Sequence, residues 1–140
     1  MRKFTNKELQ IIGPILYSCE GTQLRKDKRR KNTTYYWVIE FTNSNPKLIS
    51  LFVSFLRKII KIDEKKLKGQ LFAYKELDMA QLENYWSNIS EIPQNNFNKT
   101  IILTQKNSKY KPNPNGTFKI RYHSKEAFKK LEKIANSILE

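Results

Sequence analysis

Two segments of this chain have the pattern of strands with one apolar side and one cationic side. Residues 66–74 place Leu67, Leu71 and Ala73 on one side of an extended backbone, and residues 116–123 repeat the alternation. The opposite sides carry Lys66, Lys68 and Gln70 in the first segment and Lys119 and Arg121 in the second. A sheet of such strands buries one face under helices and leaves the other in water. The pattern therefore predicts an α+β fold with a mostly antiparallel sheet.

Helix signals lie between the strand segments. The predicted first residues or caps are Thr5 (with Glu8 in a capping box), Pro46, Asp78 and Ser124. Strands are also predicted at residues 33–42 and 99–105. The predicted order is helix, two strands, helix, strand, short helix, two strands, helix, in one domain over residues 1–140. In residues 33–42 the odd positions are predicted to face the core, and the even side, which includes Glu40, to be mixed and exposed.

The charge balance points to a polyanionic partner. The chain has 27 Lys and Arg against 13 Asp and Glu, a net charge of +14. Nucleic acid fits this excess better than an acidic membrane surface, because no basic amphipathic helix with a clean lipid-facing side stands out.

The residue composition excludes or disfavours several kinds of functional site. The single cysteine, Cys19, cannot form a disulfide within the chain, and the single histidine, His123, excludes a multi-histidine metal site. A Cys–His nucleophile pair is disfavoured, since Cys19 is expected to be buried. No signal peptide or membrane-spanning stretch is evident, so an intracellular location is expected, cytoplasmic or organellar.

The first predicted helix ends on an acidic residue, Glu20, followed by Gly21. The C-terminus of a helix carries partial negative charge, so a carboxylate is disfavoured there unless a cation lies nearby. Glu20 is therefore a candidate metal ligand. The alternative is a solvated acid at the end of an ordinary amphipathic helix.

The segment IGPILYSCEG, together with the order of elements that follows, resembles the LAGLIDADG motif of homing endonucleases. The resemblance implies an αββαββα fold whose sheet has one helix-covered face and one concave, basic face over DNA. It also implies a homodimer in which the motif helix packs on its symmetry mate through Gly13, Pro14, Tyr17 and Ser18. The apolar pattern of this helix fits burial against the sheet of its own chain equally well.

The resemblance further implies Mg²⁺-dependent hydrolysis of double-stranded DNA. Glu20 and the backbone carbonyl of Cys19 or Gly21 would hold the metal, and one Glu20 from each subunit would complete the site. Lys99 would stabilise the scissile phosphate, and Gln70 would orient water. The alternatives are a plain phosphate contact for Lys99 and a surface amide for Gln70. Departures from the motif, with Ser18 at its earlier acidic position and Pro14 inside the helix, keep two alternatives open: a DNA-binding regulator without cleavage, and an RNA-binding protein of intron splicing.

The residues predicted to contact nucleic acid come from the basic segment after Glu20 and from the polar sides of the strands. They are Gln23, Arg25, Lys28, Arg29, Arg30, Lys66, Lys68, Gln70, Lys119 and Arg121. Assignments by strand parity depend on the absence of bulges, because one extra residue moves every later side chain to the other face.

Overall fold

The structure, a computed structural model, describes residues 3–22, 25–26, 35–104 and 114–139. In these residues the α-helices are α1 (Asn6–Glu20), α2 (Pro46–Phe55), α3 (Met79–Ser90) and α4 (Lys125–Leu139). The strands are β1 (Arg25–Lys26), β2 (Tyr35–Tyr36), β3 (Val38–Asn43), β4 (Lys68–Tyr74), β5 (Ile101–Leu103) and β6 (Thr117–His123). The α+β class predicted from the sequence is confirmed.

The helices begin where the sequence places caps. Thr5 and Glu8 form a complete capping box at α1. The side chain of Asn45 accepts a hydrogen bond from Lys47 N–H, with Pro46 at the start of α2. Asp78 accepts a hydrogen bond from Gln81 N–H at α3. These bonds satisfy backbone donors that the first helical turn leaves unpaired.

The main sheet has the strand order β3-β6-β4-β5. The pairs β3–β6 and β6–β4 are antiparallel, whereas β4 and β5 are parallel, so the sheet is mixed. The parallel pair follows from α3, because a helical crossover between two adjacent strands returns the chain in the same direction. The short strands β1 and β2 pair separately as an antiparallel hairpin.

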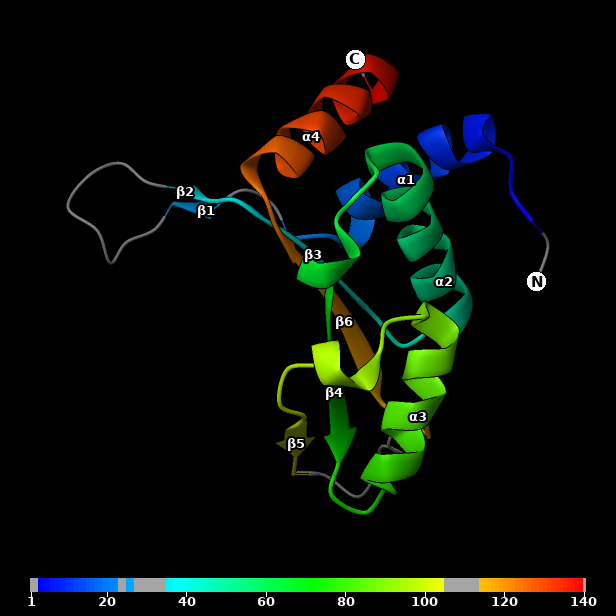
Figure 1. Cartoon of the computed structure of the whole chain (residues 1–140), viewed down its shortest axis with the longest axis vertical. Coiled ribbons are helices and arrows are strands. Elements are labelled where there is room, and N and C mark those ends of the chain that lie inside the picture. The colour runs from blue at the N-terminus through cyan, green and yellow to red at the C-terminus, as the bar shows by residue number, and fades with distance from the viewer. Residues whose placement is uncertain (1–2, 23–24, 27–34, 105–113, 140) are drawn as a thin grey trace.

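The helices cover one face of the sheet. In Figure 1, β3, β6 and β4 run through the centre with α1, α2 and α3 to one side, while β1 and β2 lie on the other side. The core forms where these helices meet the sheet: Phe52 of α2 stacks on Phe41 of β3 with ring centroids 4.5 Å apart. Trp86 of α3 stacks on Phe118 of β6 at 5.2 Å. Burial of these large rings is the main stabilising contribution at the sheet–helix interface.

Several strand boundaries differ from the sequence prediction, and β5 spans only Ile101–Leu103 of the predicted 99–105. The predicted strand at 33–42 is interrupted at Trp37, and β3 then runs from Val38 to Asn43. Lys66 lies in a short 3₁₀ turn, Glu64–Lys66, and β4 begins only at Lys68. Lys66 is exposed but is not part of the strand row in which the sequence placed it. No helix in the described ranges is long and apolar enough to cross a membrane.

Candidate nucleic-acid interface

The face of the sheet opposite the helices collects polar and cationic side chains. Here the term open sheet face denotes this side of β3, β6 and β4, with Glu40, Thr42, Lys68, Gln70, Phe72, Tyr74, Thr117, Lys119 and Arg121. The assignment rests on the alternation of burial: β4 and β6 both bury every second residue beneath the helices. Four of the predicted nucleic-acid contacts lie on the open sheet face: Lys68, Gln70, Lys119 and Arg121.

Strand register brings these four residues into two adjacent rows. Lys68 pairs with Arg121, and Gln70 pairs with Lys119. Paired residues on neighbouring strands lie about 5 Å apart, and successive rows on one face lie about 6.6 Å apart. Three cations and one amide thus share a small area that is half-buried rather than enclosed.

A buried carboxylate lies within this cationic area. Glu40 is only 5% exposed, although it was predicted to lie on an exposed side of its strand. Its Oε2 lies 3.4 Å from Lys119 Nζ and 3.8 Å from Arg121 Nε. The expectation of exposure was wrong because the pairing of Glu40 with these cations compensates its removal from water. Glu40 holds both cations on the face.

The end of α1 is attached to β3 through Tyr17. The Tyr17 hydroxyl donates to the carbonyl of Thr22 and accepts from the backbone N–H of Glu40 at 3.3 Å. Thr22 N–H donates to the Glu40 carbonyl at 2.9 Å, and Gly21 forms a bridge with Phe41. The backbone on the C-terminal side of Glu20 is therefore fixed against the edge of the sheet.

Gly21 has a packing role in this attachment. A Cβ at Gly21 would overlap the ring of Tyr17. Gly21 N–H donates to the Tyr17 carbonyl at 2.8 Å. The Glu-Gly pair that suggested a metal ligand thus has a structural component: the glycine lets the tyrosine ring pack against the chain as it leaves α1.

The structure does not bring all the predicted catalytic residues together. Glu20 is exposed at the end of α1. The Gln70 amide donates to the Lys99 carbonyl at 2.8 Å, so these two predicted residues are neighbours. Gly21 bridges to β3, β3 pairs with β6, and β6 pairs with β4. The backbone beside Glu20 is therefore three strand spacings, roughly 14 Å, from the strand that carries Gln70.

The described residues of one chain gather few ligands for a divalent metal. Within the described ranges, no group of three or more His, Cys, Asp or Glu side chains could hold a metal ion. Glu20 and the Gly21 carbonyl would supply two oxygens, and water or substrate phosphates would have to fill the remaining positions of a six-coordinate Mg²⁺. Cys19 is exposed, which corrects the expectation that it is buried.

The predicted dimer residues are mostly used inside the chain. Gly13, Pro14 and Tyr17 are buried, and Ser18 alone of the four is exposed. The ring of Phe55 packs where a Cβ at Gly13 would lie, and Tyr17 stacks on Phe52. The exposed apolar side of α1 is instead formed by Ile11 and Ile15, which are 51% and 39% exposed.

The remaining predicted contacts divide between β1 and segments outside the described ranges. Gln23, Lys28, Arg29 and Arg30 lie outside the described residues. Arg25 lies in β1, where it pairs with Tyr36 of β2. Phe72 and Tyr74 were not predicted as contacts, although they continue the alternation that placed Lys68 and Gln70 on the same side of β4.

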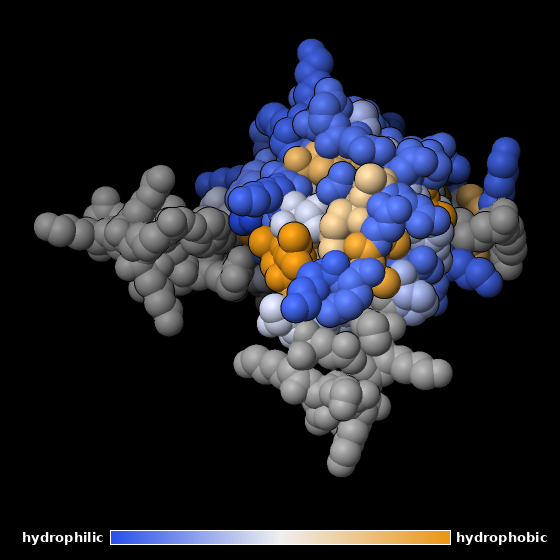
Figure 2. Space-filling view, turned by 90° about the horizontal axis from the view of Figure 1, so that it is seen from below, coloured by the Kyte–Doolittle hydropathy of each residue, from blue (hydrophilic) through white to orange (hydrophobic). Residues whose placement is uncertain are grey.

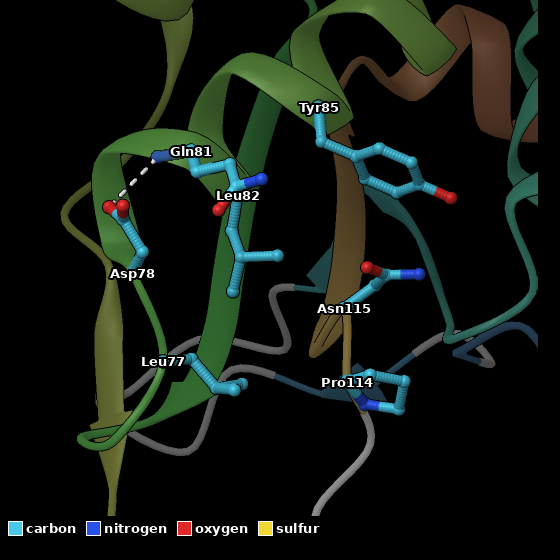
Figure 3. Close-up of a pocket in the computed structure, with 7 residues that line it drawn as sticks. All are labelled: Leu77, Asp78, Gln81, Leu82, Tyr85, Pro114 and Asn115. Atoms are coloured by element: carbon cyan, nitrogen blue, oxygen red, sulfur yellow. Dashed lines mark hydrogen bonds between the residues drawn. The ribbon is translucent and has the colours of Figure 1, made fainter.

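A pocket lies apart from the predicted site. It has a volume of about 180 Å³ and is formed by the start of α3, the turn before it and the segment before β6. Figure 3 shows Tyr85 and Asn115 on one side of it and Leu77 with Asp78 on the other. None of the residues predicted to act on nucleic acid lines this pocket.

Comparison with known proteins gives no match: neither a family model, nor a curated protein, nor a solved structure resembles this chain.

Proposed function

We propose that this protein binds double-stranded DNA on the open sheet face. The observation that carries the proposal is the register of β4 and β6, which gathers Lys68, Lys119, Arg121 and Gln70 on the side of the sheet opposite the helices. The net charge of +14 adds a long-range attraction to phosphates. Arg, Lys and Gln side chains are also the groups that hydrogen-bond to guanine and adenine edges in the major groove.

We also propose that the scaffold is that of the LAGLIDADG family. The motif helix α1, the hairpin that leads into β3, and then α2, β4, β6 and α4 follow the order αββαββα. In this proposal α3 and β5 are additions between the last two strands of the pattern. The order β3-β6-β4, with α1, α2 and α3 on one side of the sheet, supports the comparison.

Cleavage of DNA is a second candidate function, favoured by Glu20. Its carboxylate is exposed, and the backbone that follows it is fixed by Tyr17 and by the bridge to β3. A homodimer would supply two such carboxylates, which could hold divalent metal between them. Divalent metals commonly assist phosphodiester hydrolysis. Gln70 and Lys99, which are neighbours in the structure, would then act near the scissile phosphate.

The binding proposal is tested by the salt dependence of DNA affinity. The logarithm of the association constant should fall linearly with the logarithm of salt concentration, with a slope of about −0.9 per phosphate contact. Lys68→Ala and Arg121→Ala should each reduce the magnitude of that slope by about one. Lys133→Ala, which removes an exposed charge from α4, is the matched control and should leave the slope unchanged. A salt-independent affinity would contradict DNA binding.

Cleavage is tested with a library of duplexes, Mg²⁺ and the variant Glu20→Gln. Cutting by the wild type that stops with Glu20→Gln or with a chelator supports a metal-dependent endonuclease. The exposed residue Glu76 provides a charge-matched control, since Glu76→Gln should cut normally. Specific binding without cutting would identify a DNA-binding regulator. Preference for structured RNA over every duplex would favour the splicing alternative.

A further inference from the structure

The open sheet face changes from cationic to apolar along β4. Lys68 and Gln70 begin the row, and Phe72 and Tyr74 continue it. The neighbouring strand β5 extends the apolar part, because Phe72 pairs with Ile101 and Tyr74 pairs with Leu103. Directly paired residues project on the same side of a sheet. The apolar end of the open sheet face is therefore defined by Phe72, Tyr74, Ile101 and Leu103.

This apolar end is accessible. Ile101 is 40% exposed, and Phe72, Tyr74 and Leu103 are partly exposed. Figure 2 views the molecule from the end at which β5 lies and shows apolar side chains gathered near the middle of a largely hydrophilic surface. Exposed aliphatic groups beside a row of cations are costly in water unless a partner covers them.

The chemistry of the DNA major groove offers one apolar group for such a surface. Among the base-pair edges, only thymine presents a methyl group there, and isoleucine and phenylalanine side chains are suited to contact it. Phe72 and Tyr74 are about 6.6 Å apart along the strand, close to the rise of two base pairs at about 3.4 Å each. The apolar end thus matches two consecutive base steps.

Base stacking on the aromatic rings is a less suitable use of this surface. The Lys119 ammonium lies 5.1 Å from the centre of the Phe72 ring, over its face. A stacked base would have to displace that cation, with the loss of a cation–π contact. Contact with a methyl group through the ring edge and the aliphatic side chains of β5 leaves the contacts of Lys119 with Phe72 and Glu40 in place.

We propose that the apolar end contacts thymine methyl groups in duplex DNA, so that this part of the target site is rich in thymine. This inference rests on the proposed binding of DNA by the open sheet face. It assigns Phe72, Tyr74 and Ile101 to thymine, while Lys68 and Arg121 at the cationic end of the open sheet face contact phosphates.

The test replaces thymine by deoxyuridine, which differs only in lacking the methyl group. Duplex sites selected by the wild-type protein from a random library are resynthesised with deoxyuridine at each thymine in turn. At the positions covered by the apolar end, each lost methyl should weaken binding about fourfold, the equivalent of one buried methylene.

Two isoleucines of β5 provide the matched variants. Ile101→Ser removes one apolar contact, so the fourfold difference between thymine and deoxyuridine should disappear at one position and persist at the positions covered by Phe72 and Tyr74. Ile102→Ser changes a residue that is 58% exposed and adjacent in sequence but on the other side of the strand, and it should retain the fourfold difference.

Equal wild-type affinity for thymine and deoxyuridine sites would overturn the inference and leave DNA binding intact. Tighter binding to a single-stranded form of the site, without any effect of deoxyuridine, would assign the surface to base stacking and would also overturn it. Absence of binding to every duplex at low salt would overturn the proposed function and this inference together.

Discussion

At the residue scale, Gly21 is the position where a small change should be felt most directly. Gly21→Ala places a Cβ against the ring of Tyr17, which also hydrogen-bonds to Thr22 and Glu40. Overpacking of this kind typically lowers the free energy of unfolding by about 1–3 kcal/mol. Urea denaturation measures the loss. Ser18→Ala, at an exposed position on the same helix, should change the stability by less than about 0.5 kcal/mol. Equal stability of both variants would mean that the tyrosine ring does not pack on Gly21.

His123 should make stability depend on pH. Partial burial and the neighbouring Arg121 lower the pKa of His123 from its usual value, and Glu40 opposes them. Below about pH 6.5 the unfolded chain therefore takes up the proton more readily than the folded chain. The contribution of His123 to stability is present above that pH and is lost as the pH falls toward the lowered folded pKa.

The variant His123→Gln isolates this effect, since glutamine does not titrate. Urea unfolding midpoints are compared for the wild type and the variant between about pH 5 and pH 8. The difference between the two curves should change as the pH falls through about 6.5, in the direction of a less stable wild type. A constant difference over the whole range would contradict the lowered pKa.

At the scale of elements, local signals in the sequence were enough to place the helices and to orient β4 and β6. Caps such as Thr5 and Asp78 act within one helical turn, and the two-residue alternation of β6 acts within one strand. Both signals depend only on neighbouring residues, so no knowledge of the tertiary structure was needed. The four clustered contacts on β4 and β6 followed from the same parity.

The remaining differences came from interactions that local patterns do not contain. The burial of Glu40 depends on Lys119 and Arg121, more than 70 residues later in the chain. The interruption at Trp37 and the start of β4 at Lys68 are set by which residues pair across the sheet. The interior position of Gly13 depends on Phe55 of another helix. Each of these features depends on contacts between residues far apart in the sequence, which the local alternation of apolar and polar residues does not reveal.

The end of the second helical segment gives a prediction at this scale. After α2 the chain continues in a π-helical turn, Leu56–Ile60, and ends at Lys61 with φ of 62°. A residue with a Cβ is disfavoured in this left-handed conformation by about 1 kcal/mol, whereas glycine adopts it freely. Lys61 is exposed. Lys61→Gly should therefore raise the free energy of unfolding by about 0.5–1 kcal/mol, measured by urea denaturation.

A glycine in the preceding turn is the control for this variant. Lys58 is also exposed but lies inside the turn, where Lys58→Gly should destabilise the protein by about 1 kcal/mol. If Lys61→Gly raises the free energy of unfolding and Lys58→Gly lowers it, the changes come from backbone conformation, because both variants lose the same positive charge. A destabilising effect at both positions would contradict the left-handed helix end.

At the scale of the whole molecule, the proposed cleavage needs a second copy of the chain, because one copy offers only one carboxylate at Glu20. The exposed apolar side of α1 provides a contact surface: Ile11 and Ile15 lie one helical turn apart, and the exposed Cys19 follows after another turn. Two copies related by a twofold axis would bring this same stripe together from both sides. The stripe ends beside Glu20, so the dimer that covers the isoleucines would also bring the two carboxylates toward each other.

The variant Ile15→Lys tests this arrangement, because a charge at the centre of an apolar contact should weaken dimerisation more than tenfold without unfolding the chain. Sedimentation measures the oligomeric state with and without duplex DNA. Ile102→Lys introduces the same change at an exposed isoleucine on β5, away from α1, and should leave the dimer intact.

Mild oxidation should also join two wild-type chains through Cys19 and fail to do so in Ile15→Lys. A wild-type protein that stays monomeric when bound to DNA would remove the two-carboxylate site and leave the open sheet face to act in binding alone.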